Sequence, residues 1–204
     1  KKKIPIKKRH LITAAGKGSR FKKLNYRLPK IMNKFKNKYL FQLASESIEG
    51  AEIDILILSE LYKKYSNLIN SKRFNYRIHK ISNTPNGQLF SLKKLLELVS
   101  LNNEFFISSA DYQFSLNHKE LQEKISNLNP DIIIFTTSWK NFAHEKPKNY
   151  GFLEIDNQGF VKDIIEKPSE YPEEKMLKYL LMGTFWFKNS EIIESQNFNS
   201  IKIS

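Results

Sequence analysis

The chain of 204 residues contains no cysteine. Disulfide bonds and thiolate metal sites are therefore excluded, and the composition suits a reducing compartment. No apolar run approaches the roughly 20 residues that a membrane-spanning helix needs. The basic N-terminal stretch KKKIPIKKRH is followed by an apolar segment too short for a secretion signal. We therefore expect a cytoplasmic protein without a membrane partner.

Acidic residues are few relative to basic ones: 21 Asp and Glu stand against 34 Lys and Arg, a net charge of +13. Such an excess suits nucleic acid, acidic lipid or phosphorylated small molecules. The lysines are scattered along the whole chain instead of forming one stripe, which argues against nucleic acid as the main partner. Charge alone does not decide between these partners.

The length and the 40% hydrophobic content favour one domain with one core. Strand-patterned and helix-patterned segments alternate along the first two thirds, which predicts a three-layer, Rossmann-like α/β fold with a mostly parallel central sheet. The expected strands are 10–14, 53–59, 74–81, 104–108 and 131–137, and the expected helices are 39–48, 60–70, 88–100 and 118–128.

The last third has a different pattern. Segments 150–155 and 160–166 flank the sequence Asp156-Asn157-Gln158-Gly159, which predicts a hairpin with a glycine-containing turn. A further strand is expected at 179–187. The pattern therefore predicts a small antiparallel β-flap joined to the α/β core.

Glycine is scarce, with 7 in the chain, yet two stand in the sequence AAGKGSR at 14–20, directly after the first expected strand. A loop there lies at the carboxyl edge of the sheet, where open α/β folds bind ligands. Glycines let backbone N–H groups approach phosphate oxygens, and basic side chains supply the counter-charge. A triphosphate suits such a loop. The spacing matches neither the dinucleotide fingerprint nor the P-loop, and the glycine pair alone is equally well explained as a tight turn.

The pattern G-x-G-x-R with Leu28-Pro29-Lys30 after it resembles the signature of the nucleotidyltransferases that make sugar nucleotides and CDP-activated alcohols. Four further segments occur in the order that this family shows: NGQLFSL at 86–92, SSAD at 108–111, YGFLEIDNQGFVKDIIEKP at 150–168 and MGTFWF at 182–187. The resemblance covers residues 11–187. It implies transfer of a nucleoside monophosphate from a nucleoside triphosphate to the phosphate of a small acceptor, with release of pyrophosphate.

The resemblance also implies a role for individual residues. Arg20 and Lys30 would be the catalytic cations, at the β/γ-phosphates and the α-phosphate respectively, and Asp111 would hold Mg²⁺, or Mn²⁺ in its place. The nucleotide would be contacted by Ala14, Ala15, Gly16, Gly18, Gly87, Gln88 and Ala110, and the acceptor by Tyr150, Gly151, Glu166, Lys167 and Gly183.

Each of these residues also has a structural explanation. Arg20 and Lys30 could be solvated basic residues, Asp111 a turn or N-cap aspartate, and Gln88 a helix-start residue. The four histidines lack metal-ligand spacing and are expected to be structural or exposed.

The resemblance divides one domain, 1–204, into a nucleotide-binding part at about 8–138 and an acceptor-binding part at about 139–204. Family members commonly supply a second metal carboxylate after the strand that MGTFWF matches, but no aspartate follows Asp163 here. Glu191 and Glu194 lie on an expected helix in that region. Either Asp111 acts with phosphates and water alone, or the sequence is part of a longer chain.

Within the family, the chain resembles the compact cytidylyltransferases of surface polysaccharide decoration, including those that act on phosphoglutamine for capsule phosphoramidate. The resemblance therefore implies CTP and L-glutamine phosphate as substrates. A sugar 1-phosphate and phosphocholine are the alternative acceptors. Two other classes stay open: a catalytically inactive nucleotide-binding module and a basic nucleic-acid-binding domain on a similar fold. The sequence does not indicate an oligomeric state.

Overall fold

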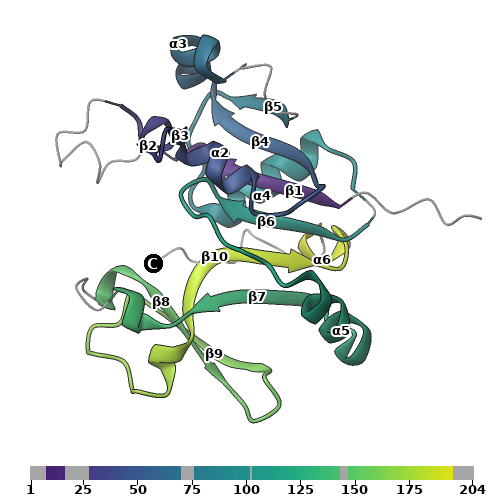
Figure 1. Cartoon of the computed structure of the whole chain (residues 1–204), viewed down its shortest axis with the longest axis vertical. Helices are drawn as coiled ribbons and strands as arrows, with labels where there is room; N and C mark the ends of the chain where they lie inside the picture. Colours follow the sequence, from purple (N-terminus) through teal and green to yellow (C-terminus); the bar gives the residue numbers. More distant parts are fainter. Residues whose placement is uncertain (1–7, 17–27, 70–75, 102, 143–146, 195–204) are drawn as a thin grey trace, which may run out of the picture. The chain divides into compact units, whose positions relative to one another are not determined.

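The computed structural model describes residues 8–16, 28–69, 76–101, 103–142 and 147–194. The chain forms two compact units, residues 1–133 with 185–204, and residues 134–184 (Figure 1). Within the described ranges, no helix has the length and apolar character needed to cross a membrane.

The first unit is built on a parallel sheet with the strand order β5-β4-β1-β6. Strand β10 joins this sheet beside β6 and runs antiparallel to it, so that Trp186 lies opposite Phe106. The strands of this unit are β1 (Arg9–Ala14), β4 (Glu52–Leu58), β5 (Tyr76–Ile81), β6 (Phe105–Ser109) and the last part of β10 (Leu180–Phe187). Strand β7 (Ile132–Thr137) begins in this unit, and its residues from 134 on belong to the second one, as does β10 up to Thr184. The helices are α2 (Leu40–Ser45), α3 (Ser59–Ile69), α4 (Gln88–Leu98), α5 (His118–Leu128) and α6 (Glu191–Glu194).

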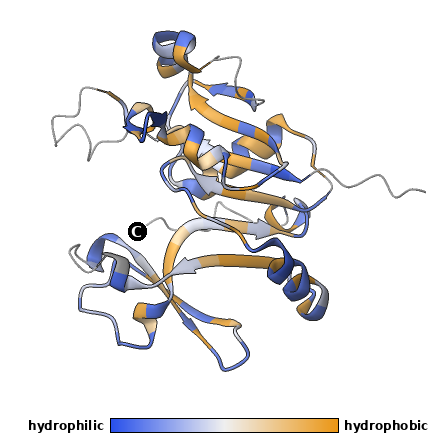
Figure 2. Cartoon of the chain, viewed as in Figure 1, coloured by the Kyte–Doolittle hydropathy of each residue, from blue (hydrophilic) through white to orange (hydrophobic). Residues whose placement is uncertain are grey.

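Side-chain alternation along the strands gives the first unit two hydrophobic clusters. Leu11 of β1 belongs to the cluster that contains Leu92 and Leu95 of α4. The next residue, Ile12, belongs to the cluster that contains Phe41 of α2. Because successive strand residues point to opposite faces, the helices cover both faces of the sheet. Figure 2 shows β4 as largely hydrophobic, as a strand buried on both faces should be, and α5 as mostly hydrophilic.

The second unit is organised around the hairpin of β8 (Gly151–Ile155) and β9 (Val161–Glu166). In its turn, the Asp156 carboxylate accepts hydrogen bonds from the backbone N–H groups of Gln158 at 2.8 Å and Phe160 at 2.9 Å. Gly159 takes a φ of +91°, which favours glycine. The unit's cluster of buried residues contains Trp139, Phe152, Met176 and Leu180.

The structure confirms the predicted fold class. It adds features that the sequence pattern did not indicate: a two-stranded hairpin of β2 (Lys34–Phe35) and β3 (Lys38–Tyr39), and short 3₁₀ helices at Lys30–Met32, Trp139–Phe142, Pro147–Asn149 and Met176–Lys178. The β2–β3 turn places Lys36 and Asn37 at positive φ, a geometry that usually selects glycine or asparagine and so left no clear signal at Lys36. That the chain is one domain with a nucleotide-binding part and an acceptor-binding part stays a prediction.

Candidate functional site

The carboxyl edge of the first unit's sheet brings several of the predicted nucleotide residues together. The register pairs Thr13 of β1 with Ser109 of β6. The segments that follow, from Ala14 to Gly16 and from Ala110 to Asp111, therefore leave the sheet side by side. Ala14, Ala15 and Ala110 are buried, whereas Gly16 is exposed and would leave space around an added Cβ atom. An open backbone stretch thus lies next to a carboxylate.

Lys30 is brought to the same edge by the short helix Lys30–Met32. Ile31 and Met32 are buried in the cluster that also contains Ala14 and Ala110. The Asn33 side-chain amide donates to the carbonyl of Lys30 at 3.1 Å and to that of Pro29 at 3.0 Å. These hydrogen bonds hold the peptide groups before and after the Lys30 Cα atom.

Lys30 and Asp111 form an ion pair at this edge. The Ser109 hydroxyl donates to the other oxygen of the same carboxylate. Both charged side chains stay accessible, with exposed fractions of 34% for Lys30 and 16% for Asp111. A cation and an anion that are positioned by the fold but still reach solvent can exchange partners when a charged ligand arrives.

The predicted base-reading segment lies at the start of α4. Gly87 precedes the helix with a φ of +96°, and no atom lies within 4 Å of a Cβ atom built there. The Ser91 hydroxyl donates to the Gly87 carbonyl at 3.0 Å. Leu89 packs against the cluster that holds Ala15, so the start of α4 is tied to the end of β1. Gln88 is partly exposed as the first residue of the helix.

Two predicted phosphate-binding residues, Gly18 and Arg20, lie outside the described residues. Among those described, no group of three or more His, Asp or Glu side chains is placed to hold a metal ion. Asp111 is thus not joined by Glu191 or Glu194 of α6 in such a group. The chemistry still suits Mg²⁺, which proteins commonly bind through one or two carboxylates together with substrate phosphates and water.

Four of the predicted acceptor residues, Tyr150, Gly151, Glu166 and Lys167, lie at the end of the β8–β9 hairpin away from its turn, and Gly183 lies in β10. Gly151 pairs with Glu166, and the backbone N–H of Lys167 donates to the Tyr150 carbonyl at 2.8 Å. A Cβ atom on Gly151 would lie 2.7 Å from Leu181 Cδ1. Both Lys167 and Gly183 have positive φ, at 49° and 65°. The backbone here takes uncommon φ values and leaves no room for a side chain at Gly151. Such features are often found where a ligand approaches the backbone.

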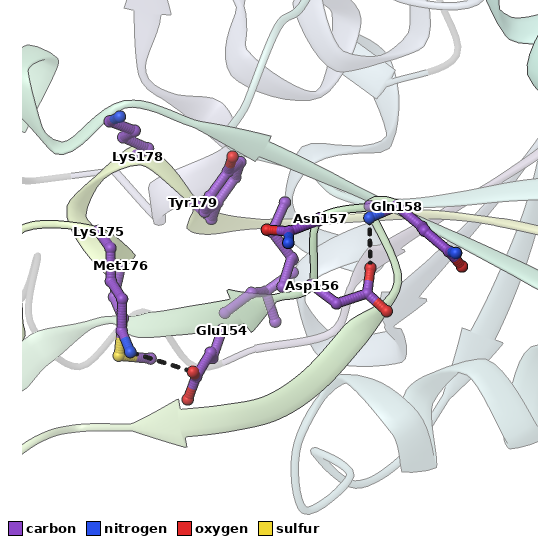
Figure 3. A pocket seen from close by; sticks show the side chains of 11 residues that line it. Glu154, Asp156, Asn157, Gln158, Lys175, Met176, Lys178 and Tyr179 are labelled. Atoms are coloured by element: carbon purple, nitrogen blue, oxygen red, sulfur yellow. Dashed lines mark hydrogen bonds and ion pairs between the residues drawn. The ribbon is translucent and has the colours of Figure 1, made fainter.

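A hollow of about 570 Å³ lies at the opposite, turn end of the same hairpin (Figure 3). Within it, Lys175 forms an ion pair with Glu154 at 3.1 Å, and this contact raises the pKa of the lysine. None of the five predicted acceptor residues lines the hollow, and no sequence motif pointed to it. Its lining comprises Leu153, Glu154, Ile155, Asp156, Asn157, Gln158, Gly159, Lys175, Met176, Lys178 and Tyr179.

Sequence reasoning also missed a charged cluster around Asp54, which is fully buried in β4. The carboxylate accepts from Arg9 at 2.6 Å, Arg77 at 2.9 Å and His79 at 2.8 Å. Burial raises the pKa of Asp54, but the hydrogen bonds from Arg77, His79 and Arg9 outweigh it and the net shift is downward. A single aspartate inside an apolar strand was the available signal.

His10 has the structural role expected for the histidines. It is fully buried, its Nε2 atom lies 2.7 Å from the Ser108 hydroxyl, and burial lowers its pKa to about 3. The ring is therefore neutral at physiological pH and supplies no charge to a phosphate.

Several known proteins resemble this chain in sequence. The sequence model of one family, described as nucleotidyl transferase, matches residues 9–201. The bifunctional protein GlmU of Thermosipho melanesiensis is 26% identical over 92% of this chain and 40% of its own length. The catalytic subunit beta of mannose-1-phosphate guanylyltransferase from Drosophila melanogaster is 25% identical over 82% of this chain and 46% of its own. The chain thus spans less than half the length of these curated relatives.

Solved structures share the fold at low identity. The inositol-1-phosphate CTP transferase of T. maritima superposes with a TM-score of 0.73 at 16% identity, covering 97% of this chain and 78% of that one. A glucose-1-phosphate thymidylyltransferase from Bacillus anthracis, so named provisionally, gives a TM-score of 0.72 at 18% identity, covering 96% and 76%.

Proposed function

The chain belongs to the nucleotidyl transferase family, and from this we propose that it transfers CMP from CTP to the phosphate of a small acceptor and releases pyrophosphate. The observation that carries the proposal is the Lys30–Asp111 pair, held beside Ala14–Gly16 at the carboxyl edge of a parallel sheet. It combines an accessible positive charge, a carboxylate of the kind that holds Mg²⁺ and an open backbone, and this combination suits a triphosphate.

The reaction needs no general base from the protein. A phosphate monoester has a second pKa near 6, so its oxygen is already nucleophilic at neutral pH. This oxygen attacks the α-phosphorus, a new P–O bond forms, and the bond from the α-phosphorus to the bridging oxygen of the β-phosphate breaks. The protein then contributes positioning and charge neutralisation. Lys30 is assigned to the α-phosphate and Arg20 to the leaving pyrophosphate.

Mg²⁺, or Mn²⁺ in its place, would neutralise phosphate charge when bound, and Asp111 is the residue assigned to hold it. Ser109 orients that carboxylate through its hydroxyl. Lys30, which shares the carboxylate in the structure, then has the α-phosphate as its alternative partner.

The acceptor is assigned to the second unit. Tyr150, Gly151, Glu166, Lys167 and Gly183 are proposed to contact it, with the Lys167 ammonium on its phosphate. We infer L-glutamine phosphate as the acceptor and capsule or surface polysaccharide biosynthesis as the context, in the cytoplasm where nucleoside triphosphates are made. The similar proteins support a phosphorylated acceptor, since their names specify inositol 1-phosphate, glucose 1-phosphate and mannose 1-phosphate. The inositol-1-phosphate enzyme's name also specifies CTP.

The test is pyrophosphate release with Mg²⁺, measured for CTP, UTP, dTTP, ATP and GTP, each against phosphoglutamine, phosphocholine and glucose 1-phosphate. Release only with CTP and phosphoglutamine is expected. Release with another pair would retain the transferase and replace the substrates. If no pair reacts but CTP raises the melting temperature, the inactive nucleotide-binding module becomes the better description. A ligand at a hundred times its Kd adds about 2.7 kcal/mol of stability.

A further inference from the structure

The β2–β3 hairpin presents an exposed aromatic ring on a small sheet of its own. The two strands form a separate two-stranded sheet in which Phe35 pairs with Lys38, and Figure 1 shows them at the margin of the first unit. Phe35 is 58% exposed. The other ring of the hairpin, Tyr39, is partly buried and stacks on Phe41 of α2, with 5.9 Å between the ring centroids. Phe35 is therefore the ring that the hairpin leaves in contact with solvent.

A single exposed aromatic residue is common on protein surfaces, but this one is surrounded by lysines. Lys34 and Lys36 are its neighbours in the chain, and the Lys36 Nζ atom lies 5.5 Å from the centre of its ring. Lys38, across the hairpin, is paired with Glu46 at 2.8 Å. Lys34 and Lys36 are exposed and form no ion pair with any residue that the structure describes. Two unneutralised positive charges thus flank the apolar ring.

The segment that contains the hairpin carries the same sign of charge throughout. The first 45 residues hold 15 of the 34 basic residues and none of the 21 acidic ones, whereas the remainder of the chain holds 19 basic and 21 acidic residues. The basic excess of the protein is therefore confined to this segment. Such a field attracts an extended polyanionic surface.

Nucleic acid and an anionic lipid bilayer are the two surfaces of this kind. Single-stranded nucleic acid is usually held in a basic groove where successive bases stack on several aromatic rings. The hairpin instead offers one exposed ring beside a tight turn, in which Lys36 and Asn37 both take positive φ. A bilayer interface accommodates such a convex tip, because aromatic rings reside at the headgroup level and lysines are attracted to anionic lipids. The geometry favours the bilayer.

We propose that the β2–β3 hairpin docks the protein on the surface of a membrane that contains anionic lipids. The Phe35 ring enters the interface, and the Lys34 and Lys36 ammonium groups lie at the lipid phosphates. The expectation of no membrane partner rested on the lack of a spanning helix, and docking at the surface needs none. This inference goes beyond the proposed function and does not depend on it.

The experiment measures cosedimentation of the protein with vesicles of phosphatidylcholine alone and of phosphatidylcholine with about 30% phosphatidylglycerol, in about 0.1 M salt. We expect the wild type to bind the anionic vesicles and not the neutral ones. Phe35→Ser should bind the anionic vesicles about five- to tenfold more weakly, because it removes an apolar ring from the interface. The double variant Lys34→Gln, Lys36→Gln should bind them about thirtyfold more weakly, at about 1 kcal/mol per lysine.

The chain offers a matched control for each change. Phe160→Ser removes a ring of similar exposure, 48%, from the turn end of the β8–β9 hairpin in the other unit. The double variant Lys63→Gln, Lys64→Gln removes two exposed lysines from α3 of the same unit. Both controls should bind anionic vesicles nearly as the wild type does. Melting temperatures of all variants, which alter exposed side chains, should stay close to that of the wild type.

Phe35→Trp reports directly on insertion of the ring. Trp139 and Trp186 are only 3% and 1% exposed, so their emission is insensitive to an added surface. The emission of Phe35→Trp should shift to shorter wavelength with anionic vesicles and stay unchanged with neutral ones. An unchanged spectrum with vesicles that do bind the protein would show that the ring stays in water, and the inference would be wrong.

Other results would also overturn the inference. If the wild type does not bind anionic vesicles, the hairpin is no membrane-docking surface. Equal binding by Phe35→Ser and the wild type, or equal losses in the hairpin variants and their controls, would leave only general charge attraction. Binding of a single-stranded oligonucleotide in place of vesicles, lost in Phe35→Ser, would make the hairpin a nucleic-acid site. Pyrophosphate release is measured without vesicles, so failure of the proposed function is seen separately.

Discussion

At the residue scale, Lys30 is the side chain whose removal separates catalysis from folding most cleanly. Lys30→Ala should lower the rate of pyrophosphate release by about 10²–10³-fold, as loss of one transition-state charge partner does. The melting temperature should change little, because about a third of this side chain is exposed and its ion pair with Asp111 is worth little to stability. A pyrophosphate release assay and a thermal melt check both.

Lys34→Ala is the matched control for Lys30→Ala, since Lys34 is an exposed lysine of β2 that follows closely in the chain and has no assigned role at the site. It should retain normal turnover. Equal loss of turnover in both variants would point to a general electrostatic effect of the basic surface, and a large drop in the melting temperature of Lys30→Ala alone would make that lysine a structural residue.

For Asp54 we expect the opposite: its replacement should lower the stability of the fold, and the residue has no assigned role in catalysis. Its folded-state pKa is lowered by Arg77, His79 and Arg9 against the opposing effect of burial. The stabilisation is therefore present above the unfolded-state pKa, about 3.9, and is lost as pH falls through the lower folded-state value. Asp54→Asn should cost on the order of 3 kcal/mol at pH 7, because it leaves buried cationic partners without their anion.

Urea unfolding of wild type and Asp54→Asn at pH 7 and pH 3 measures this linkage. The difference in unfolding free energy should shrink at the lower pH. Glu46→Gln provides the comparison, because the Glu46–Lys38 pair is exposed and should contribute less than about 1 kcal/mol. A constant difference across pH would mean that packing, not charge, accounts for the loss.

At the element scale, β9 ends the strand order of the described sheet and exposes apolar side chains, with Val161 at 42% and Ile164 at 48%. Such an edge invites pairing with another chain unless its backbone groups are satisfied. Here the Asp163 carboxylate accepts from the Ile164 backbone N–H at 2.8 Å, and a register irregularity interrupts the pairing with β8. Both features block the addition of a further strand.

Asp163→Ala should therefore free the Ile164 N–H and increase concentration-dependent association, measured by light scattering over a dilution series. Asp163→Asn keeps an acceptor oxygen and should behave like the wild type. If the alanine variant stays as dispersed as the asparagine variant, the bulge and the flanking charges are sufficient to protect the edge.

The same scale shows what the sequence could and could not predict. Apolar periodicity placed β1, β4 and β6 within one residue at each end, because these strands are largely buried. It also placed α5 correctly, although Leu121 is the buried residue of that helix. The β2–β3 hairpin escaped because its turn uses Lys36 at positive φ in place of glycine. The insertion of β10 beside β6 escaped because pairing partners depend on tertiary packing and not on local pattern. Lys30 and Asp111 were expected at one site only because the motifs that contain them resemble those of the family. Local sequence patterns cannot predict a contact between residues so distant in the chain.

At the scale of the whole molecule, the charge is divided unequally. Residues 134–184 hold seven lysines, no arginine and eight acidic residues, so the entire basic excess belongs to the first unit. That unit contains the segments assigned to the triphosphate. An excess of this size raises the local concentration of polyanions, which suits a nucleotide but suits nucleic acid as well. Salt dependence separates the two.

A nucleic-acid-binding domain that neutralises 6–10 phosphates should lose about 10³–10⁵ in affinity between 50 and 200 mM salt, because each neutralised phosphate releases condensed counterions. A triphosphate carries few charges and no condensed atmosphere of comparable density, so the Kd for CTP should rise by about tenfold or less over the same range. Titrating the protein with CTP and with a duplex oligonucleotide at both salt concentrations measures the two slopes. We expect saturable CTP binding at 200 mM salt and no measurable duplex binding there. Duplex binding that persists at 200 mM and displaces CTP would favour the nucleic-acid-binding class, because the basic surface of the first unit would then recognise an extended polyanion in preference to the triphosphate.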